Sequence, residues 1–395
     1  MRTRLAGRLG CLDVRVTPHL RSATKIIAYG LLLVIFIAVA SEIFLRVILD
    51  RPDNWYVWPP KFSAVFEASE ETTPGVTGPG RFIINSLGIR ADEPPPDADR
   101  KILVLGGSTT IDVFLDQDEM WTAILQKRLN AMSGQQKTWV GNLGKSSLAS
   151  MHHLLHFEHA LPLLPHAGLI IILIGVNDLH FALKIGNPRN MTYEQHLSWA
   201  FSVIPREQGF IPSLALYDLY KRLKEVYEKT RQGPVITYNG DGYITWRQCR
   251  REARELVDAL PDLNANLAEY RKNLNELVDQ AHTYGARLMF ITQPTLWKDN
   301  MEEPELHRLL AGGLGPNNEW CEQKRYFSPG ALARAMSLFN DITLETCAAH
   351  GLRCIDLARA LPKKAAYFYD DMHFSELGAK RVGEIVAQGV IAAAY

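Results

Sequence analysis

The chain has 395 residues, of which 47% are hydrophobic and 22% are charged, an ordinary globular composition with ample material for a buried core. Lysine plus arginine and aspartate plus glutamate number 43 each, so the formal net charge is zero. This balance excludes the global basic field that would hold a nucleic-acid backbone, and nucleic acid is not an expected partner.

An apolar segment near the amino end predicts a transmembrane helix over residues 26–49. It begins with an unbroken apolar run from Ile26 to Ala40 and ends with a second apolar stretch at Leu49. About 20 helical residues cross the hydrocarbon core of a bilayer, so the segment is long enough to span it. Glu42 and Arg46 stand four residues apart and can pair near one interface.

The charges around this segment predict its orientation. Six basic residues and one acid precede it. The positive-inside rule therefore predicts a cytoplasmic tail over residues 1–25 and a periplasmic or extracellular domain after about residue 50. A cleaved signal peptide is the alternative, because Ala38 and Ala40 have the spacing of a cleavage site. Both interpretations export the domain.

Residues 50–100 are rich in proline, glycine and acids and are interpreted as a linker and lead-in. From Lys101 on, apolar strands alternate with amphipathic helices, which predicts a parallel sheet covered by helices. The expected strands lie near 101–105, 138–142, 168–174, 287–292 and 353–357, and the expected helices near 119–132, 146–160, 262–284, 330–349 and 375–392. The prediction is an α/β domain over 101–395 with a five-stranded parallel sheet.

An insertion interrupts this alternation at about 180–260. An amphipathic helix is predicted near 213–230, and the NGDG centre of the stretch 235–246 predicts a hairpin. Aromatic residues of that stretch, together with Trp297, are candidates to line a sugar or acyl site. Core packing is the simpler explanation for most of them.

Four loops carry candidate catalytic groups. Ser108 follows the first strand, Gly144 the second and Asn177 the third, while Asp370 and His373 lie just before the last helix. Because open α/β sheets bind ligands at the carboxyl ends of their strands, we expect these loops to meet at one edge of the sheet. Each residue alone also fits a turn or a helix cap, so the prediction rests on their combination.

Acyl transfer requires residues of these types. A serine hydroxyl is a weak nucleophile until a base takes its proton, which His373 can do if Asp370 fixes its tautomer. The tetrahedral intermediate also needs hydrogen-bond donors around its oxyanion. The backbone N–H groups of Ser108 and Gly144 and the amide of Asn177 are the predicted oxyanion donors.

The order of these blocks resembles a known superfamily. GGS at 106–108, NLG at 142–144, GVND at 175–178 and DDMH at 370–373 resemble the blocks of the SGNH, or GDSL-like, hydrolases. The resemblance covers about 101–180 and 286–395, with the insertion outside it. It implies a flavodoxin-like α/β/α fold and a membrane-anchored bacterial type of hydrolase.

Carried over by position, the resemblance assigns Ser108 as nucleophile and oxyanion donor, and Asp370 and His373 as the acid and base of a DxxH block. Gly107 departs from the family's named motif, which has Asp before the serine. That Asp is not a triad group, so the departure weakens the motif match more than the mechanism. Asp371 competes with Asp370, but the three-residue spacing favours Asp370 and leaves Asp371 as a solvent or cap residue.

The helix expected after Gly144 is rich in histidine. His152, His156 and His159 share one helical face, a spacing that metal ligands use. The serine site, however, needs neither a metal nor a cofactor, and such a helix more often packs or faces solvent. No metal or cofactor is therefore expected.

The five cysteines divide between the two sides of the membrane. Cys11 lies on the cytoplasmic side, and four others lie outside, where an oxidising compartment favours disulfides. A pair between Cys347 and Cys354 is the nearest local one, which leaves Cys249 and Cys321 as a second. Four buried free thiols are the alternative.

Three classes of function fit this sequence. An esterase would use water to release the acyl group from Ser108, and an acyltransferase would pass it to a sugar or lipid hydroxyl, for example on an envelope polysaccharide. The triad is the same in both. A non-catalytic binding module on the same fold is the third class, because fold alone does not establish activity. The expected partners are an acyl ester of a carbohydrate or lipid, and the membrane.

Overall fold

The computed structural model describes residues 18–48, 54–132, 136–185, 191–205, 236–314 and 320–394, and helical positions at 215–217, 219–220 and 223. The chain divides into two compact units, one of residues 1–51 and 206–228 and one of 52–205 and 229–395. Most of the predicted tail 1–25 and of the predicted helix 213–230 lies outside the described residues.

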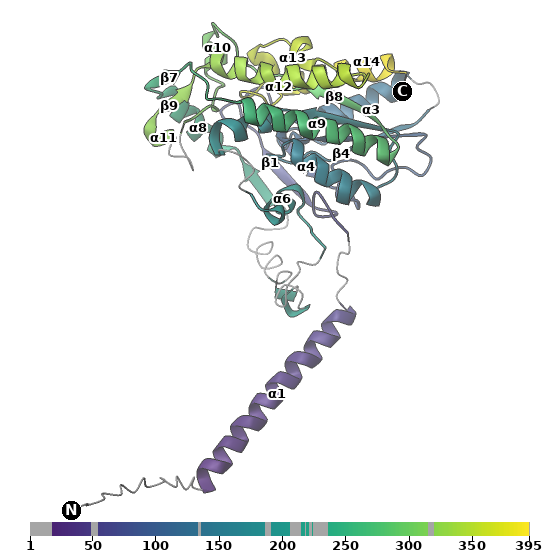
Figure 1. Ribbon diagram of the computed structural model, residues 1–395, viewed down its shortest axis with the longest axis vertical. Coiled ribbons are helices and arrows are strands. Elements are labelled where there is room, and N and C mark those ends of the chain that lie inside the picture. The colour runs from purple at the N-terminus through teal and green to yellow at the C-terminus, as the bar shows by residue number, and fades with distance from the viewer. Residues whose placement is uncertain are drawn as a thin grey trace, which may run out of the picture. The chain divides into compact units, whose positions relative to one another are not determined.

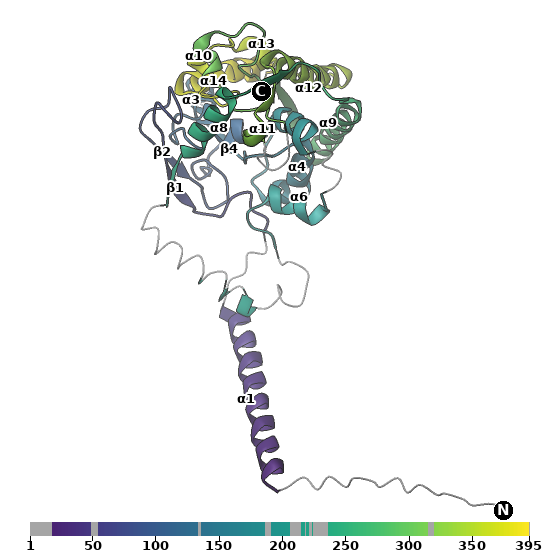
Figure 2. The same cartoon turned by 90° about the vertical axis from the view of Figure 1, so that its left-hand side faces the viewer.

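The apolar segment near the amino end forms one long helix, α1, Pro18–Ile48 (Figures 1 and 2). Its stretch Lys25–Val47 has a mean hydropathy of 2.5, and none of that stretch is buried inside the protein. It is long and apolar enough to cross a membrane, as the sequence predicted, although a signal sequence would meet the same test. Its orientation stays a prediction.

The larger unit is built on a parallel sheet. Its strands are β3, Arg100–Gly106, β4, Thr138–Asn142, β5, Leu169–Ile174, and β8, Arg287–Thr292, in the order β4-β3-β5-β8. Every residue of β4 and β5 is buried, as expected for strands covered on both faces. In chain order the sheet runs second, first, third, fourth, which is the flavodoxin-like winding.

The predicted fifth strand at 353–357 is reduced to a single bridge. Among the described residues, this stretch pairs with β8 only through Ile355, whose N–H donates to the carbonyl of Phe290. Gly351 makes a left-handed turn just before it, with φ of 64°. Asp356 already caps the next helix, α13, Leu357–Ala360. The turn and the cap leave too few residues for a strand, so the prediction of five full strands was wrong by one.

Helices cover both faces of the sheet, which makes the α/β/α sandwich. Alternate strand residues point to opposite faces. One face packs against α4, Ser150–Leu155, α9, Asn264–Tyr284, and α12, Pro329–Ala349, and the other against α3, Trp121–Met132, and α14, Glu376–Ala392. The first core contains Leu103, Leu105, Ile170, Ile172 and Phe290, and the second contains Ile102, Val104, Leu169, Ile171 and Met289.

The stretch interpreted as a linker, from residue 54 on, is part of the folded domain. It forms β1, Ser63–Glu67, and β2, Pro79–Ile83, which pair antiparallel. A strand of the insertion, β6, Ile236–Asn239, adds to the other side of β1. Phe82 and Arg90 are fully buried. The proline-rich composition of residues 54–100 does not predict this sheet, because the strand that completes it, β6, comes from far along the chain.

The hairpin predicted at 235–246 does not form. After β6 the chain turns at Gly240 and continues as a helix, α8, Asp241–Arg251, whose first acidic residue suits the positive helix end. Its buried residues are Arg247 and Arg250. They are three apart and share one face, but because they are charged, the apolar period that usually reveals a helix is missing.

Two disulfides link elements of the larger unit. Cys249 of α8 bonds to Cys321 of α11, Trp320–Gln323. Cys347 at the end of α12 bonds to Cys354 before α13, as the local spacing suggested. The remaining described α-helices and strands are α2, Ser108–Ile111, α5, Val176–His180, α6, Tyr193–Ala200, β7, Glu255–Val257, α10, Glu303–Leu306, and β9, Arg325–Phe327.

Candidate active site

The predicted nucleophile begins a one-turn helix at the carboxyl end of β3. Ser108 is the first residue of α2 and is half-buried, whereas the three residues after it are buried. The backbone N–H groups of Thr110 and Ile111 both donate to the carbonyl of Gly107, which closes the turn. The N–H of Ser108 stands at the start of this turn, where a helix leaves its donors without intrahelical acceptors.

The space around Gly107 accounts for the absence of a side chain before Ser108. A Cβ atom at this position would lie 2.3 Å from Nδ2 of Asn177. Asn177 cannot easily move away, because its Nδ2 donates to the carbonyl of Leu148 at 2.9 Å. A side chain before Ser108 would therefore displace the amide that is predicted to serve the oxyanion. The short distance also shows that the amide of Asn177 lies beside the loop that carries Ser108.

The predicted base and acid form a close pair. Asp370 Oδ2 lies 2.6 Å from Nδ1 of His373, and Asp370 Oδ1 accepts the N–H groups of Met372 and His373 at 2.9 and 2.8 Å. Asp370 is fully buried and His373 keeps 14% of its side chain exposed. Nδ1 is engaged by the carboxylate, so Nε2 is the nitrogen left to exchange a proton with a serine.

The two partners shift each other's pKa. Burial alone would raise the pKa of Asp370, but the charge and hydrogen bond of His373 outweigh it and lower that pKa. Burial would lower the pKa of His373, and the charge and hydrogen bond of Asp370 instead raise it. Asp370 thus stays ionised at neutral pH, and His373 is a stronger base than a free imidazole.

The insertion supports this pair. The ring of Tyr369 stacks on His373 with centroids 5.4 Å apart and planes at 7°. Arg247 of α8 donates to the carbonyl of Tyr369 at 2.7 Å and to those of Glu71 and Thr72 at 2.8 Å. Neither Tyr369 nor Arg247 was predicted from the sequence, because both act through packing and main-chain contacts that no motif records.

Asp371 has a structural role different from the one expected. It is fully buried and not a solvent residue. Its carboxylate accepts the indole N–H of Trp297 at 2.6 Å and the backbone N–H groups of Leu310 and Ala311 at 2.7 and 3.0 Å. Trp297 is fully buried as well, so it packs in the core and does not line a site. Asp370 is the aspartate that contacts His373.

The predicted oxyanion donors are not equally available. The N–H of Gly144 donates to Oδ1 of Asn142 at 2.9 Å, and the carbonyl of Gly144 accepts the indole N–H of Trp58. Gly144 itself lies against α2, since a Cβ atom there would stand 2.6 Å from the nitrogen of Ile111. Its N–H can therefore reach an oxyanion only by sharing its hydrogen with Asn142. Ser108 and Asn177 are the less committed donors.

A buried carboxylate links the Ser108 helix to His373. Asp112 caps α2 in a left-handed conformation with φ of 45°, and both its carboxylate oxygens are buried without a hydrogen-bond partner. Burial raises the pKa of Asp112 well above its usual range, although the charges of His373 and Arg90 oppose this. When ionised, Asp112 would in turn raise the pKa of His373. The loop of His373 is thus a neighbour of α2.

Substitution of Asp112 tests its charge. Because burial raises the pKa of Asp112 well above its usual range, we expect its carboxyl to be protonated where His373 loses its proton. Asp112→Asn, which is also uncharged, should then leave the acid limb of kcat/KM in place. Asp118→Asn, at an exposed position of the same loop, is the control and should leave the limb in place as well. An acid limb that moves to lower pH in Asp112→Asn alone would show that Asp112 is ionised and raises the pKa of His373.

The histidines of the α4 region have separate partners. His152 accepts the N–H of Ala149 at Nδ1, Nε2 of His156 lies 3.3 Å from the carbonyl of Ala200, and His159 contacts the hydroxyl of Tyr193. Burial lowers the pKa of His152 to about 3 and that of His156 to about 4, so both are neutral. Within the described part of the chain, no three such side chains cluster to hold a metal ion.

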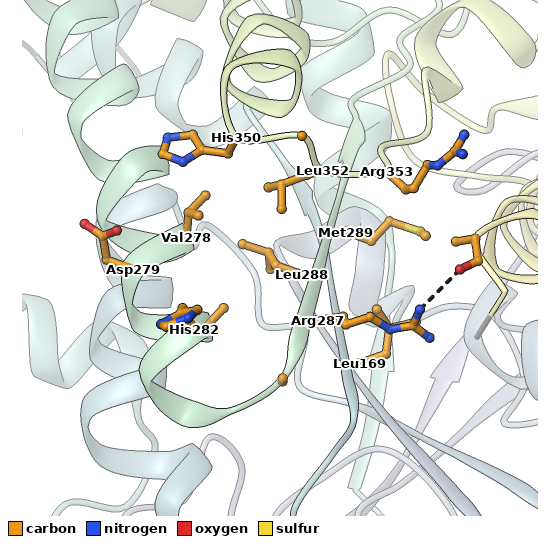
Figure 3. Close-up of a pocket in the computed structure, with 14 residues that line it drawn as sticks. Leu169, Val278, Asp279, His282, Arg287, Leu288, Met289, His350, Leu352 and Arg353 are labelled. Atoms are coloured by element: carbon orange, nitrogen blue, oxygen red, sulfur yellow. Dashed lines mark hydrogen bonds between the residues drawn. The ribbon is translucent and has the colours of Figure 1, made fainter.

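A pocket of about 480 Å³ lies away from this site, at the amino-terminal ends of β5 and β8 (Figure 3). Val278, Leu288 and Leu352 converge on it, and Arg287 closes one side by donating to the carbonyl of Ala393. It includes none of the predicted catalytic residues. Among the described residues, the beginning of β8 pairs with β5 on one edge only, and the pocket lies where the shortened fifth strand leaves its other edge unpaired.

Comparison with known proteins finds likenesses among solved structures. No family model and no curated protein matches the chain. Sixty solved chains match. The strand order β4-β3-β5-β8 is by itself the flavodoxin-like order that the resemblance implied. One similar structure is LAE5, an alpha/beta hydrolase enzyme from the metagenome of Lake Arreo, Spain, with 15% identity and a TM-score of 0.39 over 75% of this chain and 95% of that chain. Another is the acetylxylan esterase Axe2 from Geobacillus stearothermophilus, with 13% identity and a TM-score of 0.39 over 75% of this chain and 94% of that chain. A third is a putative lipolytic protein of the G-D-S-L family from Desulfitobacterium hafniense DCB-2, with 11% identity and a TM-score of 0.37 over 74% of this chain and 99% of that chain.

Proposed function

We propose that this chain is a serine ester hydrolase of the SGNH type, with Ser108, His373 and Asp370 as its triad. The observation that carries the proposal is the Asp370–His373 pair, 2.6 Å apart, whose loop contacts the loop after the Ser108 helix through the rings of Tyr369 and Phe114. A histidine fixed in this way at Nδ1 and open at Nε2 suits a base that serves a serine.

The reaction follows from these groups. The proton of the Ser108 hydroxyl passes to Nε2 of His373 while Oγ attacks the ester carbonyl, and the tetrahedral oxyanion is held by the N–H of Ser108 and the amide of Asn177. Collapse breaks the ester bond, and the leaving alcohol takes the proton from His373. Water then repeats the sequence on the acyl-enzyme and releases the acid. Asp370 stabilises the imidazolium in both steps.

An acyltransferase is the second candidate, because a sugar or lipid hydroxyl can replace water in the last step. The two disulfides favour an oxidising compartment, and α1 is suited to anchor the domain at a membrane that faces it. We propose that the domain lies outside the cytoplasm. There an acylated carbohydrate or lipid of the envelope is the expected substrate.

The two candidates differ in the product. The full chain in lipid nanodiscs is incubated with a short-chain aryl ester, with and without an oligosaccharide acceptor, and the products are weighed by mass spectrometry. Hydrolysis predicts free acid at the same rate in both samples. Acyl transfer predicts an acylated sugar and a faster release of the aryl alcohol when the acceptor is present. A protein that only binds the ester, with no product in either sample, would contradict both candidates.

A further inference from the structure

A short helical segment of the insertion belongs to the same compact unit as α1. Residues 215–217, 219–220 and 223 are helical and are described, and the unit contains them together with the whole of α1. They are called here the 215–223 segment. Catalysis does not use it, and its sequence lies outside the blocks that resemble the hydrolase family.

A carboxylate of α1 binds the start of this segment. Oε1 of Glu42 accepts the N–H of Ala215 at 2.8 Å, and Oε2 accepts the N–H of Leu216 at 3.1 Å. Arg46 donates to the same carboxylate at 2.7 Å. Glu42 thus satisfies two consecutive backbone N–H donors of the segment, and Arg46 balances its charge. The segment is therefore attached to α1 at its first turn.

The position of Glu42 along α1 fixes the depth of this attachment. The apolar stretch Lys25–Val47 has 23 residues, which is about 35 Å of helix against about 30 Å of hydrocarbon. Glu42 stands five residues before Val47, so it lies about 8 Å along the helix axis from the end of that stretch. The residues that Glu42 binds, Ala215 and Leu216, thus lie near the boundary between hydrocarbon and headgroups.

The segment exposes an apolar face. Leu216, Tyr220 and Leu223 are 38%, 61% and 59% exposed. Their spacing of four and three residues places them along one side of a helix. Leucine and tyrosine on one side are typical of helices that lie in the membrane interface, where tyrosine is enriched.

We propose that the 215–223 segment lies on the membrane surface, with Leu216, Tyr220 and Leu223 inserted between lipid headgroups and with Glu42 of α1 holding its first turn. The partner is the lipid bilayer itself. The continuity with a membrane-spanning helix favours lipid over a protein partner, because the apolar face begins where α1 leaves the hydrocarbon. The proposal requires that α1 span the membrane and does not depend on the catalytic assignment.

Lipid contact can be measured on the full chain. A Cys11→Ser background that carries Leu223→Cys is labelled with an environment-sensitive fluorophore and placed in nanodiscs with lipids that bear a nitroxide near the headgroup. The matched control is Leu338→Cys on α12, which is 41% exposed. The label at 223 should be quenched at least about twofold more than the label at 338. Equal quenching at the two positions would overturn the proposal.

A second variant tests the attachment. Glu42→Ala removes both acceptors of the segment's first turn, and it should reduce the quenching at 223 toward that at 338. Full quenching in Glu42→Ala would overturn the role of Glu42. Resistance of the full chain to alkaline extraction is measured on the same preparation, and release from the membrane would contradict the whole proposal, since α1 would then not span.

Discussion

Replacing either Ser108 or His373 with alanine is expected to reduce ester turnover by about 10⁴-fold or more, because each removes a group without which the other cannot act. The double variant should be little slower than either single one. Steady-state rates on one aryl ester, with each variant checked for an unchanged unfolding transition, measure this. Losses that multiply in the double variant would mean that the two residues do not work as one unit.

The oxyanion donors should behave differently. Asn177→Ala removes one donor and leaves the nucleophile and base, so a loss of about 10²–10³-fold is expected. Asn177 also contacts Gly107 and the carbonyl of Leu148. The thermal transition of the variant therefore has to be measured beside its rate, so that a shift of the Ser108 loop is not mistaken for the lost donor.

Arg90→Ala should strongly destabilise the folded domain. Arg90 is fully buried and crosses the loop that follows α2. Its guanidinium donates to the carbonyls of Asp112, Leu115 and Arg81 at 2.8, 2.6 and 3.1 Å, and also to that of Ile111. Alanine would leave four carbonyls without this donor, and we expect a loss of at least about 4 kcal/mol in the free energy of unfolding.

Two comparisons make this measurement specific. Arg271→Ala removes a surface ion pair with Glu345, both partners exposed, and should cost less than about 1 kcal/mol. Arg90→Lys should not restore stability, because an ammonium cannot reproduce the planar fork of donors. Denaturant-induced unfolding of the three variants measures the free energy of unfolding of each. An Arg90→Ala protein as stable as Arg271→Ala would show that the buried guanidinium is dispensable.

The sheet could be predicted from the sequence because its strands are apolar on both faces and its helices keep a clear period. β5 is Leu169–Ile174 with every residue apolar and buried, and α9 was predicted to within two residues at its start. The errors occurred where the buried side chains are charged and where a strand's neighbour is distant in the sequence. Arg247 and Arg250 hide the helical period of α8, and β1 is completed by β6 from far along the chain.

The candidate site could be predicted only as far as its motifs extend. Asp370 and His373 are three residues apart, so local spacing predicted their pairing. The engagement of Gly144 by Asn142, the stacking of Tyr369 on His373 and the orphaned carboxylate of Asp112 are tertiary contacts. No spacing in the sequence encodes them, and only the packed loops reveal that the N–H of Gly144 is already engaged by Asn142.

The most direct test of the catalytic assignment is covalent labelling of the resting protein with a fluorophosphonate, read by intact mass and by peptide mapping. Such a reagent reacts with a serine that an adjacent base activates. The account predicts one adduct per chain, on Ser108, in the wild type, none in Ser108→Ala and strongly slowed labelling in His373→Ala. A wild type that stays unlabelled, or an adduct that persists in Ser108→Ala, would contradict the assignment of Ser108 as an activated nucleophile.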